Sequence, residues 1–63
     1  MSRRHFQFFV VEESGKILKE VARACYSANA PFHASAILNK NPDAAAVFAV
    51  EKDGLSTYSA YRH

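Results

Sequence analysis

The sequence predicts a small α+β domain with a three-stranded, mainly antiparallel sheet and one long amphipathic helix packed on one face. Three patterns carry this prediction. An aromatic and β-branched run near the amino terminus is typical of a strand, and an apolar repeat at spacings of three and four follows it. Two short runs joined by a turn near the carboxyl terminus indicate a hairpin. The expected order within a single domain over 1–63 is strand, helix, short helix or strand, and hairpin.

The first strand is expected in the run HFQFFVV near the amino terminus. Aromatic and β-branched residues suit a pleated, half-buried surface. Phe6, Phe8 and Val10 alternate on one face. Phe9 and Val11 place bulk on the opposite face, so we expect this strand to be central or covered on both sides.

The long helix is expected from Gly15 to about Ala28, with Ser14 as its N-cap. Its apolar stripe consists of Ile17, Leu18, Val21, Ala22, Cys25 and Ala28. Asn29 and Pro31 are expected to end it, because asparagine tolerates the left-handed cap and proline cannot continue the hydrogen-bond ladder.

Residues 31–40 permit two interpretations. As a helix, the segment carries Pro31 in its first turn and an apolar face of Ala34, Ile37 and Leu38. As a strand, Phe32, Ala34, Ala36 and Leu38 alternate with polar residues, which is also a fair pattern. Its alanine content favours the helix, and the strand remains the alternative.

The hairpin is expected around the turn Lys52-Asp53-Gly54. A type I turn followed by a left-handed glycine makes a three-residue loop. This loop pairs Phe48 with Tyr58 and puts both on the apolar face of the sheet, with Val47 on the other face. We prefer this register because its face is the more apolar.

Two alternatives for the same segment stay open. A two-residue turn at Asp53-Gly54 would shift the pairing by one residue and place Phe48 opposite Ser59. A helix over residues 44–52, capped by Asp43, would remove the hairpin altogether, because short apolar runs do not separate helix from strand by periodicity.

The preferred register divides the apolar residues of the sheet between its two faces. The face expected against the helix carries Phe6, Phe8, Val10, Phe48, Val50 and Tyr58. The second face retains Phe9, Val11, Val47 and Tyr61, and so short a chain has little left to cover them. An exposed apolar patch commonly marks a contact surface, unless residues 31–40 fold over it.

The excess positive charge lies at the two ends of the chain, in Arg3, Arg4 and Arg62. If the connection from the first strand returns parallel, the last strand runs antiparallel to it. The start of the first strand and the end of the last would then meet at one sheet edge. We therefore expect a basic cluster of Arg3, Arg4 and Arg62, with His5 and His63 beside it.

Composition limits the classes of protein that remain. A chain of 63 residues buries only about 60% of the surface of its unfolded form, so self-association would add stability. A single cysteine cannot form an internal disulfide, which favours a reducing cytoplasmic location. No segment approaches the ~20 apolar residues of a membrane span.

The residues of catalytic and metal sites lack the spacing that such sites need. Ser14 lies outside any nucleophile elbow, and Cys25 belongs to an apolar stripe. No two of the histidines and the cysteine have the short spacing at which one element presents two metal ligands. We expect no catalytic residue, no metal and no cofactor.

The resulting hypothesis is a non-enzymatic intracellular adaptor or modulator that acts by protein contact, including contact with itself as a homodimer. Phe9, Val11, Val47 and Tyr61 would form the contact, and Arg3, Arg4 and Arg62 would attract an acidic partner. The alternative is a small nucleic-acid-binding module that uses the same arginines with Tyr58 or Tyr61, since aromatic rings stack on bases.

Overall fold

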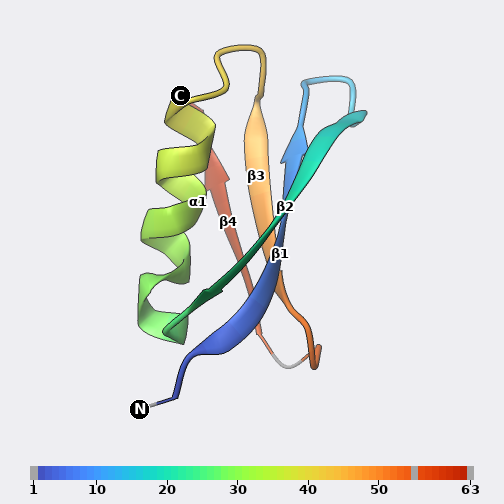
Figure 1. The fold of residues 1–63 in the computed structure, drawn as a ribbon. Coiled ribbons are helices and arrows are strands. Elements are labelled where there is room, and N and C mark those ends of the chain that lie inside the picture. Colours follow the sequence, from blue (N-terminus) through green and yellow to red (C-terminus); the bar gives the residue numbers. More distant parts are fainter. Residues whose placement is uncertain (1, 55, 63) are drawn as a thin grey trace.

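Four strands and one helix make up the fold in the computed structural model, which describes residues 2–54 and 56–62 (Figure 1). The strands are β1 (Arg4–Val11), β2 (Ile17–Cys25), β3 (Ala46–Glu51) and β4 (Thr57–Tyr61). A 3-10 turn η1 (Ser27–Asn29) leads into helix α1 (Ala30–Asn39). All neighbouring strands are antiparallel, in the order β2-β1-β3-β4. The predicted strands at β1, β3 and β4 are confirmed.

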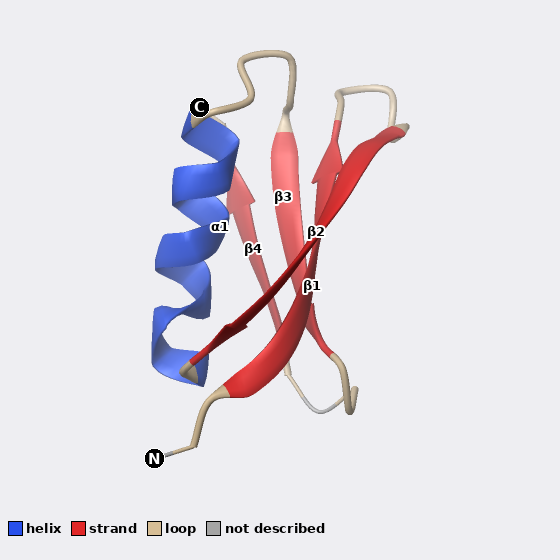
Figure 2. Cartoon of the chain, viewed as in Figure 1, coloured by secondary structure: helices blue, strands red, loops and turns tan. Residues whose placement is uncertain are grey.

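The predicted long helix is wrong, because residues 17–25 form strand β2 (Figure 2). Gly15 has a φ of 94°, and its N–H donates to the Glu12 carbonyl at 2.9 Å. The Glu12 N–H donates to the Lys16 carbonyl at 2.9 Å. These bonds close a tight turn that needs glycine at its left-handed position. Ser14 therefore belongs to a turn rather than to a helix cap, and the sheet has four strands rather than three.

Pairing with β1 explains why residues 17–25 form a strand rather than a helix. β2 lies against β1 over its length, from Ile17 opposite Val11 to Cys25 opposite Arg4. A central strand leaves backbone donors and acceptors unpaired if one of its edges stays empty, and unpaired buried groups are costly. The segment also alternates in the strand sense, since Val21 and Cys25 turn inward while Glu20 and Ala24 are exposed.

Helix α1 confirms the preferred interpretation of residues 31–40. Pro31 lies in its first turn, where a missing N–H does no harm. The buried side of the helix consists of Ala30, Ala34, Ile37 and Leu38. α1 packs mainly over β3 and β4 and covers one face of the sheet (Figure 1).

The core lies between α1 and the covered face of the sheet. Phe8 and Val10 from β1 have no exposed surface, and Phe6 is 2% exposed. Aromatic rings pack within this layer: the Phe6 and Tyr58 ring centroids are 6.1 Å apart, and those of Phe8 and His33 are 6.3 Å apart. The predicted inward orientation of these β1 residues and of Tyr58 is therefore confirmed.

The register of the β3–β4 hairpin differs from the preferred prediction. Gly54 has a φ of 75° and donates its N–H to the Glu51 carbonyl, as expected for the turn. The Glu51 N–H, however, donates to the Ser56 carbonyl at 2.9 Å, so the pairing closes one residue later than predicted. Phe48 consequently lies opposite Ser59, which is the pairing of the two-residue-turn alternative.

This one-residue shift exchanges the two faces of β3. Val47 and Ala49 turn toward α1 and are fully buried, whereas Phe48 and Val50 turn away and are half-buried. The helix lies over this part of the sheet, where the small Ala49 lets it approach closely. A phenylalanine in that position would overpack the interface, which costs stability. The alternative of a helix over residues 44–52 does not occur, because Ala46–Glu51 is strand β3.

Replacement of Val47 by threonine tests the register. The buried hydroxyl of Val47→Thr is expected to lower the free energy of unfolding by about 1–3 kcal/mol. Val50→Thr on the same strand is the matched control and should cost less than about 1 kcal/mol, because its hydroxyl reaches water. Urea denaturation measures both. A larger loss for Val50→Thr than for Val47→Thr would restore the register preferred from sequence.

Candidate functional site

The open face is the side of the sheet that faces away from α1, and no other described element covers it (Figure 1). The strand registers assign its members. They are His5, Gln7, Phe9 and Val11 of β1, Ile17, Glu20, Ala22 and Ala24 of β2, Ala46, Phe48 and Val50 of β3, and Thr57, Ser59 and Tyr61 of β4. Most of these side chains are apolar, so the face offers a hydrophobic surface.

Three of the four residues predicted for a contact surface lie on the open face: Phe9, Val11 and Tyr61. Val47 does not, because the shifted register buries it under α1 with no exposed surface. The placement of Val47 beside the other three is therefore corrected. Phe48 takes its place, and only the alternative hairpin register could have indicated it from sequence.

Aromatic side chains gather toward one end of the open face. Phe9 lies directly opposite Phe48 on the neighbouring strand. The rings of Phe48 and Tyr61 meet edge to face, with centroids 5.8 Å apart and an interplanar angle of 84°. Tyr61 is 59% exposed and Ile17 is 50% exposed. This aromatic end is therefore available for contact.

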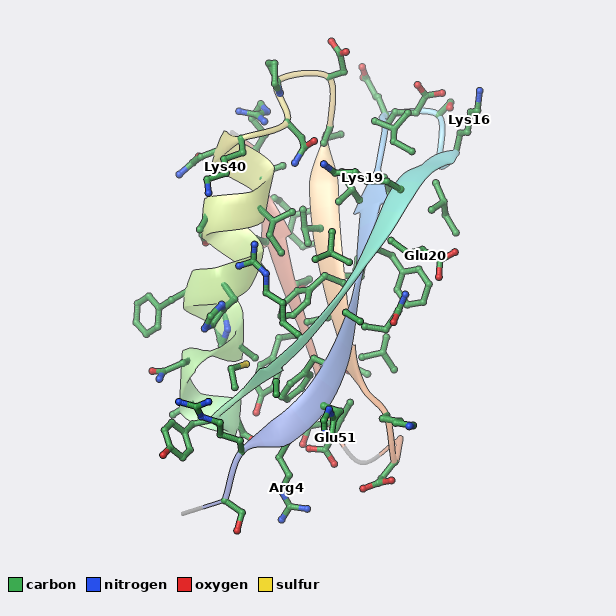
Figure 3. All side chains as sticks on the ribbon, viewed as in Figure 1. Arg4, Lys16, Lys19, Glu20, Lys40 and Glu51 are labelled. Atoms are coloured by element: carbon green, nitrogen blue, oxygen red, sulfur yellow. The ribbon has the colours of Figure 1, made fainter. Side chains whose placement is uncertain are left out.

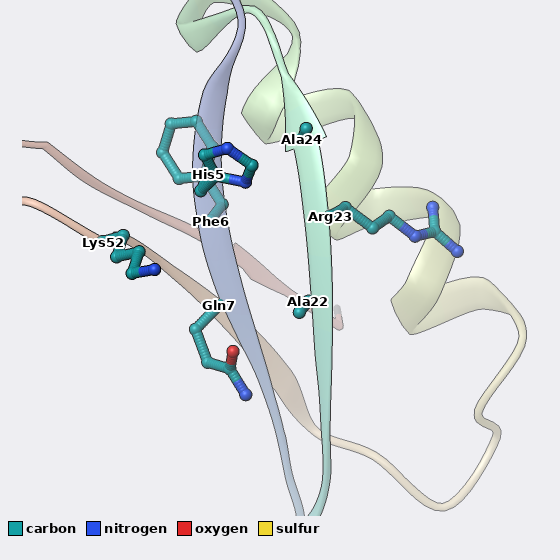
Figure 4. Close-up of a pocket in the computed structure, with 7 residues that line it drawn as sticks. All are labelled: His5, Phe6, Gln7, Ala22, Arg23, Ala24 and Lys52. Atoms are coloured by element: carbon teal, nitrogen blue, oxygen red, sulfur yellow. The ribbon is translucent and has the colours of Figure 1, made fainter.

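The other end of the open face is hollowed (Figure 4). The hollow has a volume of about 470 Å³, and its floor includes Ala22 and Ala24, whose small side chains leave the space. His5 and Lys52 stand on its rim, and the Lys52 ammonium brings positive charge to it. Beside it, the Gln7 Nε2 donates to the Glu20 Oε1 at 3.0 Å, which satisfies that carboxylate within the face.

The predicted basic cluster is wrong, because Arg3 and Arg4 lie at one end of the sheet and Arg62 at the other (Figure 1). β2 and α1 each reverse the chain, so β3 returns antiparallel to β1 rather than parallel. The end of β4 then lies at the opposite end of the sheet from the start of β1.

Arg62 holds the end of the helix against the sheet. Its Nη2 donates to the Leu38 carbonyl at 2.7 Å and to the Asn41 carbonyl at 3.0 Å, and its Nε donates to the Ala44 carbonyl at 3.0 Å. The last carbonyls of a helix lack intrahelical partners and carry partial negative charge. A guanidinium suits them, so Arg62 has a structural role.

The remaining chemical groups are dispersed. The Cys25 thiol is 5% exposed, and burial raises its pKa, although the Arg23 charge opposes the shift. Glu51 is 4% exposed, and one of its oxygens has no hydrogen-bond partner among the described residues. In the described part of the chain, no group of three or more His, Cys, Asp or Glu side chains could hold a metal ion. Within the same residues, no helix is long and apolar enough to cross a bilayer.

Comparison with known proteins assigns no family to this chain. No family model, curated protein or solved structure matches it.

Replacement of Arg62 tests its structural role. Arg62→Gln removes the charge and most of the hydrogen bonds to the helix end, so we expect a loss of about 1–2 kcal/mol in the free energy of unfolding. Arg4→Gln is the control, because no hydrogen bond of the exposed Arg4 side chain is found among the described residues. Urea denaturation of the two variants is the measurement, and equal losses would show that Arg62 contributes nothing specific.

Burial of Cys25 predicts that its thiol reacts slowly with alkylating reagents. A raised pKa lowers the thiolate fraction at a given pH, and only the thiolate is the nucleophile. Iodoacetamide at pH 8 should modify the folded chain at least tenfold more slowly than the chain unfolded in urea. Because the pKa of the thiol is higher in the folded chain than in the unfolded chain, deprotonation favours unfolding. The thiol's contribution to the free energy of unfolding is therefore highest below the ordinary thiol pKa of about 8.5 and falls as the pH rises above it. Equal rates for the two forms would show that the thiol is accessible.

Proposed function

We propose that this chain is a non-enzymatic adaptor or modulator that acts by docking another protein on its open face. The observation that supports this proposal is the uncovered apolar side of the sheet, with Phe9, Phe48 and Tyr61 grouped at one end. A surface of this composition is typical of protein interfaces, where aromatic residues are enriched at the core.

A second copy of the same chain is the occupant that suits the open face best. Its aromatic end is bulky, and its other end is hollow over Ala22 and Ala24. The two lie diagonally across the face, the aromatic end toward β3 and β4 and the hollow toward β2. A two-fold axis in the plane of the interface, oblique to the strands, would lay each aromatic end over the hollow of the partner. Such an interface uses the same patch on both subunits. The aromatic side chains of each subunit would fill the hollow of the other.

The size of the face sets the strength of the expected dimer. Four strands spaced by about 4.8 Å and about five residues long give a footprint of roughly 19 by 17 Å. A standard interface buries about 800 Å² on each partner, which is roughly a fifth of the 4322 Å² that this chain exposes. The footprint, roughly 320 Å², is less than half of that standard area, so we expect a weak dimer with a dissociation constant in the micromolar range or above.

Charge and location complete the proposal. Lys52 gives the rim of the hollow a positive charge, and Arg3 and Arg4, at the start of β1, lie at the same end of the sheet. An acidic group on a heterologous partner would be attracted there.

A fold that buries its one cysteine needs no disulfide, so the cytoplasm is the proposed location.

Removal of the aromatic end tests the proposal. Sedimentation equilibrium of the wild-type chain should show a dimer, and the double variant Phe9→Ser, Tyr61→Ser should weaken it at least tenfold. Phe32→Ser is the matched control, because Phe32 is an aromatic residue 74% exposed on α1, away from the open face. Its dimerisation should be unchanged. Circular dichroism verifies that each variant is folded.

Two outcomes contradict parts of this proposal. A wild-type monomer that captures another protein, and loses it in the double variant, would leave the open face as the docking site but remove the second copy as its occupant. A wild-type monomer whose contacts are unaffected by the double variant would overturn the assignment of the open face.

A further inference from the structure

The side of the molecule between β2 and α1 carries a concentration of basic residues. We call it the basic strip, and it consists of Lys19 and Arg23 of β2, His33 of α1, and Lys40, the residue that directly follows α1. It lies on the side of the sheet opposite to the open face, so it is separate from the surface proposed for dimerisation.

The strand register places the two β2 members on the covered side of the sheet. Lys19 lies opposite Val10, and Arg23 lies opposite Phe6, both of which point toward the core. α1 packs mainly over β3 and β4. The helix therefore does not lie over this edge, which leaves Lys19 exposed and Arg23 half-buried.

Helix α1 and the residue that follows it present the other two members toward β2. The His33 Nδ1 lies 3.4 Å from the Arg23 Nη1. Lys40 follows His33 by seven residues, or about two helical turns, so both lie on the same side of α1. β2 and α1 run in opposite directions, which places Lys19 about 13 Å along the strand from Arg23 and Lys40 about 10 Å along the helix from His33. Figure 3 shows Lys19 and Lys40 toward the same end of this side.

No acidic side chain neutralises the basic strip. Among residues 2–54 and 56–62, none of its four members has a hydrogen bond or ion pair with a carboxylate, and the partner of Arg23 is an imidazole nitrogen. The acidic residues lie elsewhere. They are Glu12 and Glu13 in the β1–β2 turn, Glu20 on the open face, Glu51 in the core, and Asp43 and Asp53 in loops. The net charge of only +2 is thus unevenly distributed over the surface. The half-buried Arg23 guanidinium has no carboxylate partner among the described residues.

We propose that the basic strip binds the phosphate backbone of a single-stranded nucleic acid. Two exposed aromatic residues near the His33 end of the strip favour this ligand over an acidic peptide, and one of them, Tyr26, lines the same surface pocket as His33. Phe32 precedes His33 on α1 and is 74% exposed, and Tyr26 follows β2 and is 38% exposed. The Arg3 guanidinium lies 5.9 Å from the centroid of the Tyr26 ring. Phosphate contacts combined with rings on which bases stack are the general mode of single-strand binding.

Fluorescence anisotropy with a labelled oligothymidylate of about 12 nucleotides tests this proposal. The wild-type chain should bind it at about 20 mM salt, and the affinity should fall as salt rises, because each phosphate contact releases counterions. The double variant Lys19→Gln, Lys40→Gln should bind at least tenfold more weakly. Its logarithmic salt slope should be flatter by about 0.7 for each lost contact.

Matched variants separate the basic strip from net charge. Lys16→Gln with Lys52→Gln also removes two positive charges, but from the β1–β2 turn and the rim of the hollow, and should weaken binding less than threefold. Phe32→Ser should weaken oligothymidylate binding about fivefold while leaving the binding of inorganic tripolyphosphate unchanged. An equal effect of the two lysine pairs would show that binding depends on net charge alone and would overturn the site.

Two further results decide the chemistry of the ligand. The absence of binding at about 20 mM salt would overturn the proposal, since phosphate contacts are strongest there. Displacement of the oligonucleotide by polyglutamate at equal charge concentration would identify an acidic protein as the ligand instead. The Phe9→Ser, Tyr61→Ser variant should lose dimerisation but retain full oligonucleotide binding. The test of the dimer and the test of the basic strip can therefore fail independently of each other.

Discussion

Pairing along both edges of β1 is the constraint on which the rest of the structure depends. β1 supplies Phe6, Phe8 and Val10 to the core, so its backbone lies within the protein and both of its edges need partners. β3 pairs with one edge and β2 with the other. Because residues 17–25 are used for this pairing, only the ten-residue helix α1 remains to cover the sheet. One short helix covers one face, and the opposite face stays open.

This arrangement gives the molecule two unlike surfaces. The open face is apolar and aromatic, whereas the basic strip on the other side carries charge that no described acidic residue neutralises. Both surfaces follow from the position of α1, which packs over β3 and β4 and leaves the β2 side of the covered face free. Because the surfaces lie on opposite sides of the sheet, a partner on one would not obstruct a ligand on the other.

Small details of turn geometry decide which side chains reach each surface. Both hairpin turns share the pattern Glu-x-x-Gly, with Gly15 and Gly54 in the left-handed region. The first closes over three residues and the second over four, since Glu51 pairs with Ser56. Successive side chains of a strand point to opposite faces. One additional loop residue therefore buries Val47 and brings Phe48 to the open face.

The sequence by itself determined β1, favoured α1 and the two carboxyl-terminal strands over their alternatives, and grouped Phe9, Val11 and Tyr61 on one face of the sheet. Proline placement, turn residues and alternation support these features, although they leave helix and strand open for residues 31–40. Only the tertiary structure decided that residues 17–25 form a strand, because their apolar spacing satisfies a helix equally well and the deciding interaction is pairing with β1, which a pattern within the segment does not contain. It also decided the β3–β4 register and the separation of Arg62 from Arg3 and Arg4. Both depend on how closely α1 packs and on strand directions that no local pattern contains.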